Sequence, residues 1–186
     1  MSFHNQKILP AIRSMKEFEK MLDSPYQYGV FLDMQIGHLR SAYRLAKEHH
    51  RHMFLHFDLI QGLSRDEFAT DFVCQEFKPF GIISTKSNVI RRAKQKGVLA
   101  TQRTFIIDSS ALNRSVELVN QNNPDFIEVL PGVVPKIITQ MHKRTGKRIF
   151  AGGLIETRKE VEEALLAGAV AITTSNQALW KVYENK

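Results

Sequence analysis

Short apolar runs and amphipathic segments alternate along the whole chain of 186 residues. The runs are rich in β-branched and aromatic residues, which is typical of buried strands, whereas the segments between them have the apolar spacing of helices. The predicted strands are residues 8–12, 28–32, 53–58, 81–85, 98–103, 126–130, 148–151 and 169–173. The predicted helices are residues 15–24, 37–50, 64–77, 87–95, 110–120, 135–144, 157–166 and 177–184.

This alternation predicts an α/β fold, a single-domain parallel (βα)8 TIM-like barrel over residues 1–186. A closed barrel leaves no exposed sheet edge. An open doubly wound sheet is the alternative. The barrel is favoured because a helix follows the last predicted strand and no Gly-x-Gly-x-x-Gly turn follows the first. The chain is short for this fold, so its connecting loops must be short.

Residues at the predicted helix ends support these boundaries. Ser64 and Glu67 have the spacing of a capping box, and Pro135 suits a first helical turn. A left-handed residue is favoured directly after a helix, and glycine adopts that conformation most easily. Glycines follow three of the predicted helices, at Gly97, Gly146 and Gly168.

Composition narrows the class of protein. The apolar runs are much shorter than the roughly 20 residues of a membrane span, and residues 1–7 lack the apolar core of a signal peptide. We therefore expect a cytoplasmic protein with no membrane partner. The single cysteine, Cys74, excludes an intramolecular disulfide framework, and its apolar surroundings favour a buried structural thiol over a nucleophile. The net charge of +7 favours an anionic partner, which leaves both small phosphates and RNA open.

Two stretches near the C-terminus carry the chemistry of a phosphate site. Residues 150–155 contain Gly152 and Gly153, and residues 171–176 end in Thr174, Ser175 and Asn176. Glycines let a ligand approach the backbone closely, and hydroxyl and N–H groups before a helix suit a phosphate. In the predicted barrel these are the ends of the seventh and eighth strands, where such barrels commonly bind phosphate groups.

Polar residues also stand at the ends of the other predicted strands. His56 and Asp58 are two residues apart, so both are expected on the same side of one strand. A charge inside a strand, such as Glu128, needs a partner or a ligand. The alternative to a ligand is an internal ion pair with Lys86 or Arg103. The predicted polyol- and charge-binding residues are His56, Asp58, Lys86, Arg103 and Glu128.

These residues fit two classes of function. Carboxylates can accept hydrogen bonds from the hydroxyls of a polyol phosphate while Lys86 or Arg103 balances the phosphate charge. The same set could be catalytic, with His56 as acid or base and with Asp58 and Glu128 holding a divalent metal. That arrangement describes a phosphosugar enzyme or a phosphodiesterase. The chemistry of the residues alone leaves both classes open.

Several blocks in order closely resemble the glycerol uptake operon antiterminator regulatory protein family, and together they span nearly the whole chain. They are residues 56–63 (HFDLIQGL), 81–86 (GIISTK), 102–103 with 108–109, 124–132 (PDFIEVLPG), 151–155 (AGGLI) and 174–176 (TSN). One small departure is the order of hydroxyl residues at positions 173–175, which leaves their chemistry intact.

The resemblance implies a bacterial, cytoplasmic, non-enzymatic TIM-barrel protein. Such a protein senses glycerol 3-phosphate as its effector and acts on the leader RNA of glycerol-utilisation transcripts to prevent premature termination. No cofactor is implied, whereas a divalent metal and a homo-oligomer stay open. The alternatives are a phosphosugar enzyme or glycerophosphodiester phosphodiesterase, and a sensor that acts through another protein. The predicted phosphate ligands are Gly132, Gly152, Gly153, Thr174, Ser175 and Asn176.

Basic residues gather at the ends of three predicted helices, in residues 40–52, 91–96 and 142–148. Cations at helix C-termini on a solvated face are the simplest explanation of each cluster alone. Together the clusters predict a basic surface at the barrel face opposite the ligand site. No RNA-recognition signature is present, so the RNA contacts rest on the resemblance and the net charge. The predicted RNA-binding residues are Arg91, Arg92, Lys94, Lys96, Lys143 and Arg144.

Overall fold

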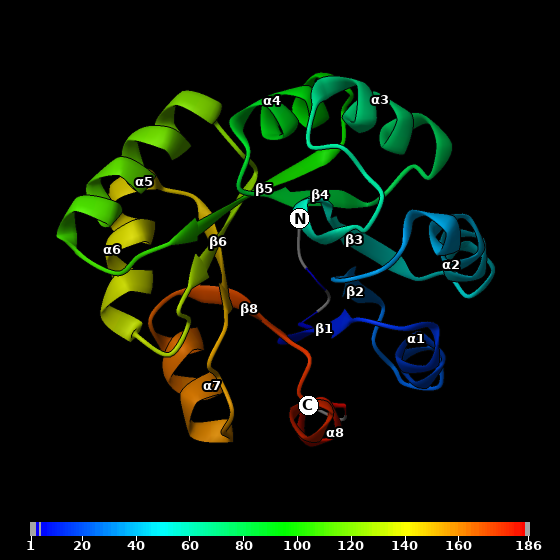
Figure 1. Ribbon diagram of the computed structural model, residues 1–186. Helices are drawn as coiled ribbons and strands as arrows, with labels where there is room; N and C mark the ends of the chain where they lie inside the picture. The colour runs from blue at the N-terminus through cyan, green and yellow to red at the C-terminus, as the bar shows by residue number, and fades with distance from the viewer. Residues whose placement is uncertain (1–2, 4, 185–186) are drawn as a thin grey trace.

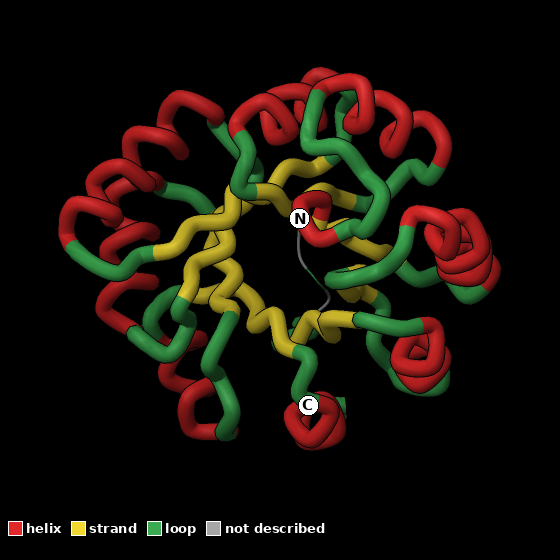
Figure 2. Tube along the Cα trace, viewed as in Figure 1, coloured by secondary structure: helices red, strands yellow, loops and turns green. Residues whose placement is uncertain are grey.

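The computed structural model describes residue 3 and residues 5–184, and within them eight parallel strands close into a barrel. Figures 1 and 2 show the strands around a central axis and the helices outside them. Every strand pairs with its neighbours in sequence, and β8 pairs with β1 through Ile8↔Ile172, Leu9↔Thr173 and Pro10↔Thr174. The predicted (βα)8 barrel is confirmed, and the open sheet is excluded.

The strands are β1 (Ile8–Ile12), β2 (Tyr28–Phe31), β3 (His52–His56), β4 (Gly81–Ser84), β5 (Leu99–Phe105), β6 (Phe126–Leu130), β7 (Arg148–Gly152) and β8 (Ala169–Thr174). The helices are α1 (Met15–Leu22), α2 (Ile36–Glu48), α3 (Glu67–Glu76), α4 (Ser87–Gln95), α5 (Ser109–Asn122), α6 (Pro135–Thr145), α7 (Arg158–Leu166) and α8 (Gln177–Tyr183). A short 3-10 helix, η1 (Phe57–Leu59), follows β3. Among the described helices, none is long and apolar enough to cross a membrane.

The end of the third strand differs from the prediction. β3 stops at His56, and the chain tightens into η1, where Phe57 is fully buried. The Arg65 guanidinium donates to the Asp58 carbonyl through Nε at 3.1 Å and Nη2 at 2.9 Å, which helps to hold this turn. The expectation that His56 and Asp58 share one face of a strand is therefore wrong.

The capping residues are partly as predicted. α3 begins at Glu67, and its N-cap is Asp66, whose carboxylate accepts a hydrogen bond from the Ala69 N–H at 2.8 Å. The capping box predicted at Ser64 is wrong because Asp66, an equally good cap, lies nearer the first helical turn. Pro135 opens α6 as predicted. The three glycines after helices are confirmed, since they have φ of +73°, +66° and +108° at Gly97, Gly146 and Gly168.

Aromatic side chains fill the end of the barrel at which the strands begin. Phe54, Phe126 and Phe150 are fully buried, and the Phe126 and Phe150 rings stack with centroids 4.6 Å apart. Phe3, before the first strand, packs on this group, with ring centroids 5.5 Å from Phe126 and 5.6 Å from Phe150. A filled lower barrel leaves the carboxyl ends of the strands as the place for polar groups and a ligand.

Candidate functional site

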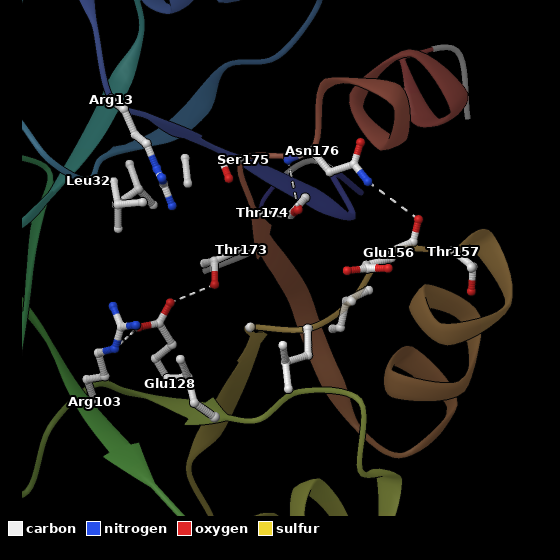
Figure 3. Close-up of a pocket in the computed structure, with 16 residues that line it drawn as sticks. Arg13, Leu32, Arg103, Glu128, Glu156, Thr157, Thr173, Thr174, Ser175 and Asn176 are labelled. Atoms are coloured by element: carbon white, nitrogen blue, oxygen red, sulfur yellow. Dashed lines mark hydrogen bonds and ion pairs between the residues drawn. The ribbon is translucent and has the colours of Figure 1, made fainter.

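A cavity of about 640 Å³ opens at the carboxyl ends of the strands, between β1, β2, β5, β6 and the segments that follow β7 and β8 (Figure 3). A cavity of this size suits a small molecule. Its polar lining comes from Arg13, Arg103, Glu128, Gly153, Glu156, Thr157, Thr173, Thr174, Ser175 and Asn176. The cavity is therefore rich in cations, carboxylates and hydroxyls.

Glu128 is the buried carboxylate of this site. Its Oε1 accepts a hydrogen bond from Thr173 Oγ1 at 2.6 Å, and its Oε2 lies 3.5 Å from Arg103 Nε. The internal ion pair considered for Glu128 is thus formed with Arg103 from the adjacent strand. Within the described structure, Glu128 Oε2 and Arg103 Nε are buried without a hydrogen-bond partner. Such atoms have unused capacity to bind the hydroxyl of a ligand.

His56 supports Arg103 from below the cavity. Arg103 Nη1 donates a hydrogen bond to His56 Nε2, which makes that nitrogen the acceptor of a neutral ring. Burial lowers the pKa of His56, and the charge of Arg103 lowers it further, while Glu128 and Asp58 act in the opposite direction. His56 does not line the cavity, so it would not touch a ligand there. Its role is to position the Arg103 guanidinium.

Burial of His56 predicts a pH-dependent part of the stability. The pKa of His56 in the folded protein lies below the ordinary value of 6.5. In acid, the unfolded chain therefore binds a proton at His56 more readily than the folded protein does. This contribution is present above pH 6.5 and is lost as the pH falls below it. Between about pH 7.5 and pH 5.5, we expect the free energy of unfolding in urea to fall more for the wild type than for His56→Gln. Parallel pH curves for the two proteins would contradict this.

Asp58 lies outside the cavity and has a structural role. Its carboxylate accepts hydrogen bonds from Ser84 Oγ at 2.5 Å, from the Thr85 N–H at 2.7 Å and from Thr85 Oγ1 at 2.7 Å. These bonds tie η1 to the end of β4. The sequence predicted that Asp58 would bind a ligand together with Glu128 and Arg103. Glu128 and Arg103 line the cavity, whereas Asp58 does not. Lys86 is also outside the cavity lining, because it is the exposed N-cap residue of α4.

The predicted phosphate residues divide into two groups. Gly132 and Gly152 do not line the cavity but pack the ends of β6 and β7 together, with the Gly132 N–H donating to the Gly152 carbonyl at 2.7 Å. A Cβ on Gly132 would lie 2.8 Å from the Gly152 nitrogen, so the close packing requires glycine. The other four residues line the cavity, namely Gly153, Thr174, Ser175 and Asn176.

Hydrogen bonds near the chain's end distinguish the residues of this second group. The Asn176 side chain caps α8 by accepting from the Ala178 N–H at 3.0 Å, and Thr174 Oγ1 accepts from the Asn176 N–H at 3.1 Å. Ser175 makes no side-chain hydrogen bond to any of the described residues. Its hydroxyl therefore stays available inside the cavity.

Arg13 is a cavity residue that the sequence reasoning missed. It directly follows β1, and Figure 3 shows its side chain pointing into the cavity on the side of Ser175, while Arg103 and Glu128 line another wall. Its guanidinium makes no hydrogen bond or ion pair with another described residue. Alternate residues of a strand face the same side, so Arg13 continues the series of Leu9 and Ala11 in β1. This spacing was the sequence signal that could have identified Arg13.

The alternative in which acidic residues hold a metal gains no support from this geometry. Within the described part of the chain, no group of three His, Cys, Asp or Glu side chains is placed to hold a metal ion. The Asp58 carboxylate already accepts three hydrogen bonds from Ser84 and Thr85. Cys74 is buried as expected, and burial raises the pKa of its thiol to about 11.

Most of the predicted RNA-binding cations of α4 lie in ion pairs. Arg92 contacts the Asp71 carboxylate at 2.5 Å, and Lys96 lies 3.4 Å from the same group. Lys94 lies 3.0 Å from Asp125. These carboxylates partly neutralise the positive charge of the surface and so weaken its electrostatic attraction for a polyanion.

The remaining predicted cations are held less tightly. Arg91 donates to Asn122 at 3.3 Å, and Arg144 donates to Asn113 at 3.0 Å. Lys143 is exposed near the end of α6. Amide partners leave the charge of Arg91 and Arg144 in place, so these residues stay candidates for an anionic partner.

The closed barrel, with a charged cavity at the carboxyl ends of its strands, places the chain in the class of (βα)8 barrel proteins. The family model described as glycerol-3-phosphate responsive antiterminator matches residues 8–180, and the chain belongs to this family. The chain is 42% identical to the glycerol uptake operon antiterminator regulatory protein of Listeria monocytogenes str. 4b F2365, with a TM-score of 0.94 and coverage of 97% and 98% of the two chains.

Two further relatives agree with this assignment. A glycerol uptake operon antiterminator-related protein from Thermotoga maritima MSB8 is 32% identical, with a TM-score of 0.84 and coverage of 95% of this chain and 98% of that one. The uncharacterized protein YgcP of Escherichia coli (strain K12) is 30% identical over 173 residues, which cover 93% of this chain and 91% of the relative. Both relatives match over nearly the whole of this chain and of their own.

Proposed function

We propose that the protein is a glycerol-3-phosphate-responsive transcription antiterminator that binds the leader RNA of glycerol-utilisation transcripts. Membership of the antiterminator family supports this function. The observation that carries it is the cavity, where Arg13, Arg103 and Glu128 bring two cations and a buried carboxylate together. A regulator of nascent transcripts acts in the bacterial cytoplasm, and it needs no catalytic residue.

The cavity offers complementary groups to each half of glycerol 3-phosphate. The phosphate fits between the Arg13 guanidinium and the Ser175 hydroxyl, next to the backbone of Gly153, because charge-assisted hydrogen bonds to arginine are strong. The glycerol hydroxyls can donate to Glu128 Oε2 and accept from Arg103 Nε, the two atoms of the ion pair, neither of which makes a hydrogen bond to a described residue. Ligand binding would then satisfy these buried polar atoms.

Arg13→Ala tests the phosphate end of this cavity. A charge-assisted hydrogen bond contributes about 1.5–3 kcal/mol, so we expect glycerol 3-phosphate to bind about 10- to 150-fold more weakly by calorimetry. Lys16→Ala is the matched control, because Lys16 is an exposed cation that does not line the cavity. Equal affinity of Arg13→Ala and wild type would place the phosphate elsewhere.

The same protein samples decide between a regulator and an enzyme. Purified wild type is expected to bind glycerol 3-phosphate and return it unchanged after prolonged incubation. Conversion of glycerol 3-phosphate or of a glycerophosphodiester into products, in proportion to protein concentration, would contradict the proposal and favour the phosphosugar enzyme.

A further inference from the structure

A second hollow, of about 700 Å³, lies at the opposite end of the barrel, between the C-terminal parts of α2 and α3 and the start of β3. The two helices are neighbours around the barrel (Figure 1). The Arg40 guanidinium on α2 reaches Glu76 on α3 at 3.0 Å, and the Tyr43 and Phe77 rings stack with centroids 5.8 Å apart. We call this hollow the α2/α3 groove.

The α2/α3 groove is strongly basic. Its lining cations are Arg40, Arg44, Lys47, Arg51 and Lys78, and its one lining carboxylate, among the residues described, is Glu76. Lys47 and Lys78 are exposed, and neither makes an ion pair with any other described residue. Arg40 and Arg44 pair with Glu76 and Glu48, which leaves Lys47, Arg51 and Lys78 of the groove outside any ion pair among the described residues. In the α4 cluster, Arg92, Lys94 and Lys96 all pair with Asp71 or Asp125. The groove is therefore the better site for a polyanion.

Aromatic rings line the same groove. His52 is exposed at the start of β3, and its ring stacks on Tyr28 with centroids 5.2 Å apart and planes at 26°. Phe80 is partly exposed and lies 5.1 Å from the His52 ring, centroid to centroid. Rings beside cations are typical of surfaces that bind single-stranded nucleic acid, since bases stack on the rings while phosphates contact the cations. An acidic protein segment would gain little from the rings.

We propose that the α2/α3 groove binds a single-stranded segment of RNA. The inference rests on the proposed function, because it names the surface through which the antiterminator contacts its transcript. The groove lies at the end where the strands begin, whereas the effector cavity lies where they end. The RNA and glycerol 3-phosphate therefore bind at opposite faces, and the effector acts on RNA through the barrel and not by touching it.

The first test is charge reversal in the groove. The double variant Lys47→Glu, Lys78→Glu is compared with Lys136→Glu, Lys181→Glu, which changes the net charge equally at exposed positions outside both cavities. By fluorescence anisotropy, we expect the groove variant to bind labelled leader RNA at least about tenfold more weakly. In a plot of log K against the logarithm of the salt concentration, the slope for the groove variant should be smaller in magnitude by about two. The control variant should keep the wild-type slope.

The second test separates bases from phosphates. His52→Ala removes an exposed ring and leaves the lysines and arginines of the groove in place. The loss of one base stacked on a ring weakens binding by about fivefold or more. We expect this loss with single-stranded leader RNA and none with inorganic polyphosphate, which has no bases. An equal loss with both probes, or tighter binding of polyglutamate than of RNA, would overturn an RNA groove.

The remaining outcomes distinguish this inference from the proposed function. If wild type binds leader RNA and the groove variant binds it equally well, the groove is wrong and the antiterminator function stands. A loss in Arg91→Glu, Arg92→Glu without a loss in the groove variant would move the site to α4. If wild type fails to bind leader RNA, the proposed function fails and the groove with it. Retained glycerol 3-phosphate binding shows that each variant is folded.

Discussion

Gly153→Glu is expected to weaken the binding of glycerol 3-phosphate by more than about 100-fold. Gly153 lines the effector cavity together with Ser175 and Arg13, so a glutamate at this position places a negative charge and a long side chain where the phosphate is expected. Two like charges placed side by side cost several kcal/mol. Calorimetric titration of the purified variant with glycerol 3-phosphate measures the loss directly.

Gly153→Ala is the matched control for this variant. Gly153 has φ of +77°, so any side chain strains the backbone, and an added Cβ would lie 3.1 Å from Leu130 Cδ2. We expect the alanine variant to lose about 1 kcal/mol of stability but to keep most of its affinity for the effector. If alanine weakens binding as strongly as glutamate does, backbone strain explains the effect and the position of the phosphate is wrong.

Glu128→Ala is expected to lower the free energy of unfolding by about 3–5 kcal/mol, the cost of removing one partner of a buried ion pair. The Glu128 side chain is 5% exposed and the Arg103 side chain is 15% exposed. Removal of the Glu128 carboxylate leaves the Arg103 guanidinium with only the neutral His56 ring beside it. It also leaves the Thr173 hydroxyl without its hydrogen-bond acceptor. Urea denaturation followed by circular dichroism measures the change.

Glu128→Gln separates the two contributions of this side chain. The amide oxygen can still accept the Thr173 hydrogen bond, while the charge that balances Arg103 is gone. We expect a loss smaller than that of alanine but still greater than about 1 kcal/mol. A loss below this value in both variants would show that solvent in the cavity screens the pair and that Glu128 contributes little to the fold.

The barrel was predictable because each element has its own local signal. The strands are short and mostly buried, and the glycines after α4, α6 and α7 adopt the left-handed conformations that end those helices. The Arg103–Glu128 pair was also within reach of the sequence. These residues lie in adjacent strands, and the register pairs them directly. A buried charge needs an opposite charge, and the neighbouring strand supplied it.

The role of Asp58 could not be predicted, because it depends on where a strand ends. A period of two places Asp58 beside His56 only if β3 continues past His56, and the 3-10 turn breaks this period. The turn instead directs the Asp58 carboxylate to Thr85 in the next strand–helix connection. Tertiary hydrogen bonds of this kind leave no pattern in the local sequence.

Which of the basic surfaces is best suited to bind a polyanion also could not be predicted from the sequence. The sequence shows clusters of cations but not the carboxylates that neutralise them, since Asp71 and Asp125 come from separate segments. Nor does it show that α2 and α3 leave a hollow lined by His52 and Phe80. Only the packing of neighbouring helices distinguishes an exposed, unpaired lysine such as Lys47 from the paired cations of α4.

The affinity of the wild-type protein for its leader RNA, with and without glycerol 3-phosphate, shows whether the protein is an effector-responsive RNA-binding regulator. A fluorescence anisotropy titration at fixed salt is sufficient, with glycerol and inorganic phosphate as separate controls. We predict that saturating glycerol 3-phosphate tightens RNA binding by about fivefold or more, the usual lower range of allosteric coupling, and that neither control does so. Equal RNA affinity in the presence and absence of the effector, under conditions where calorimetry shows the effector bound, would contradict the account.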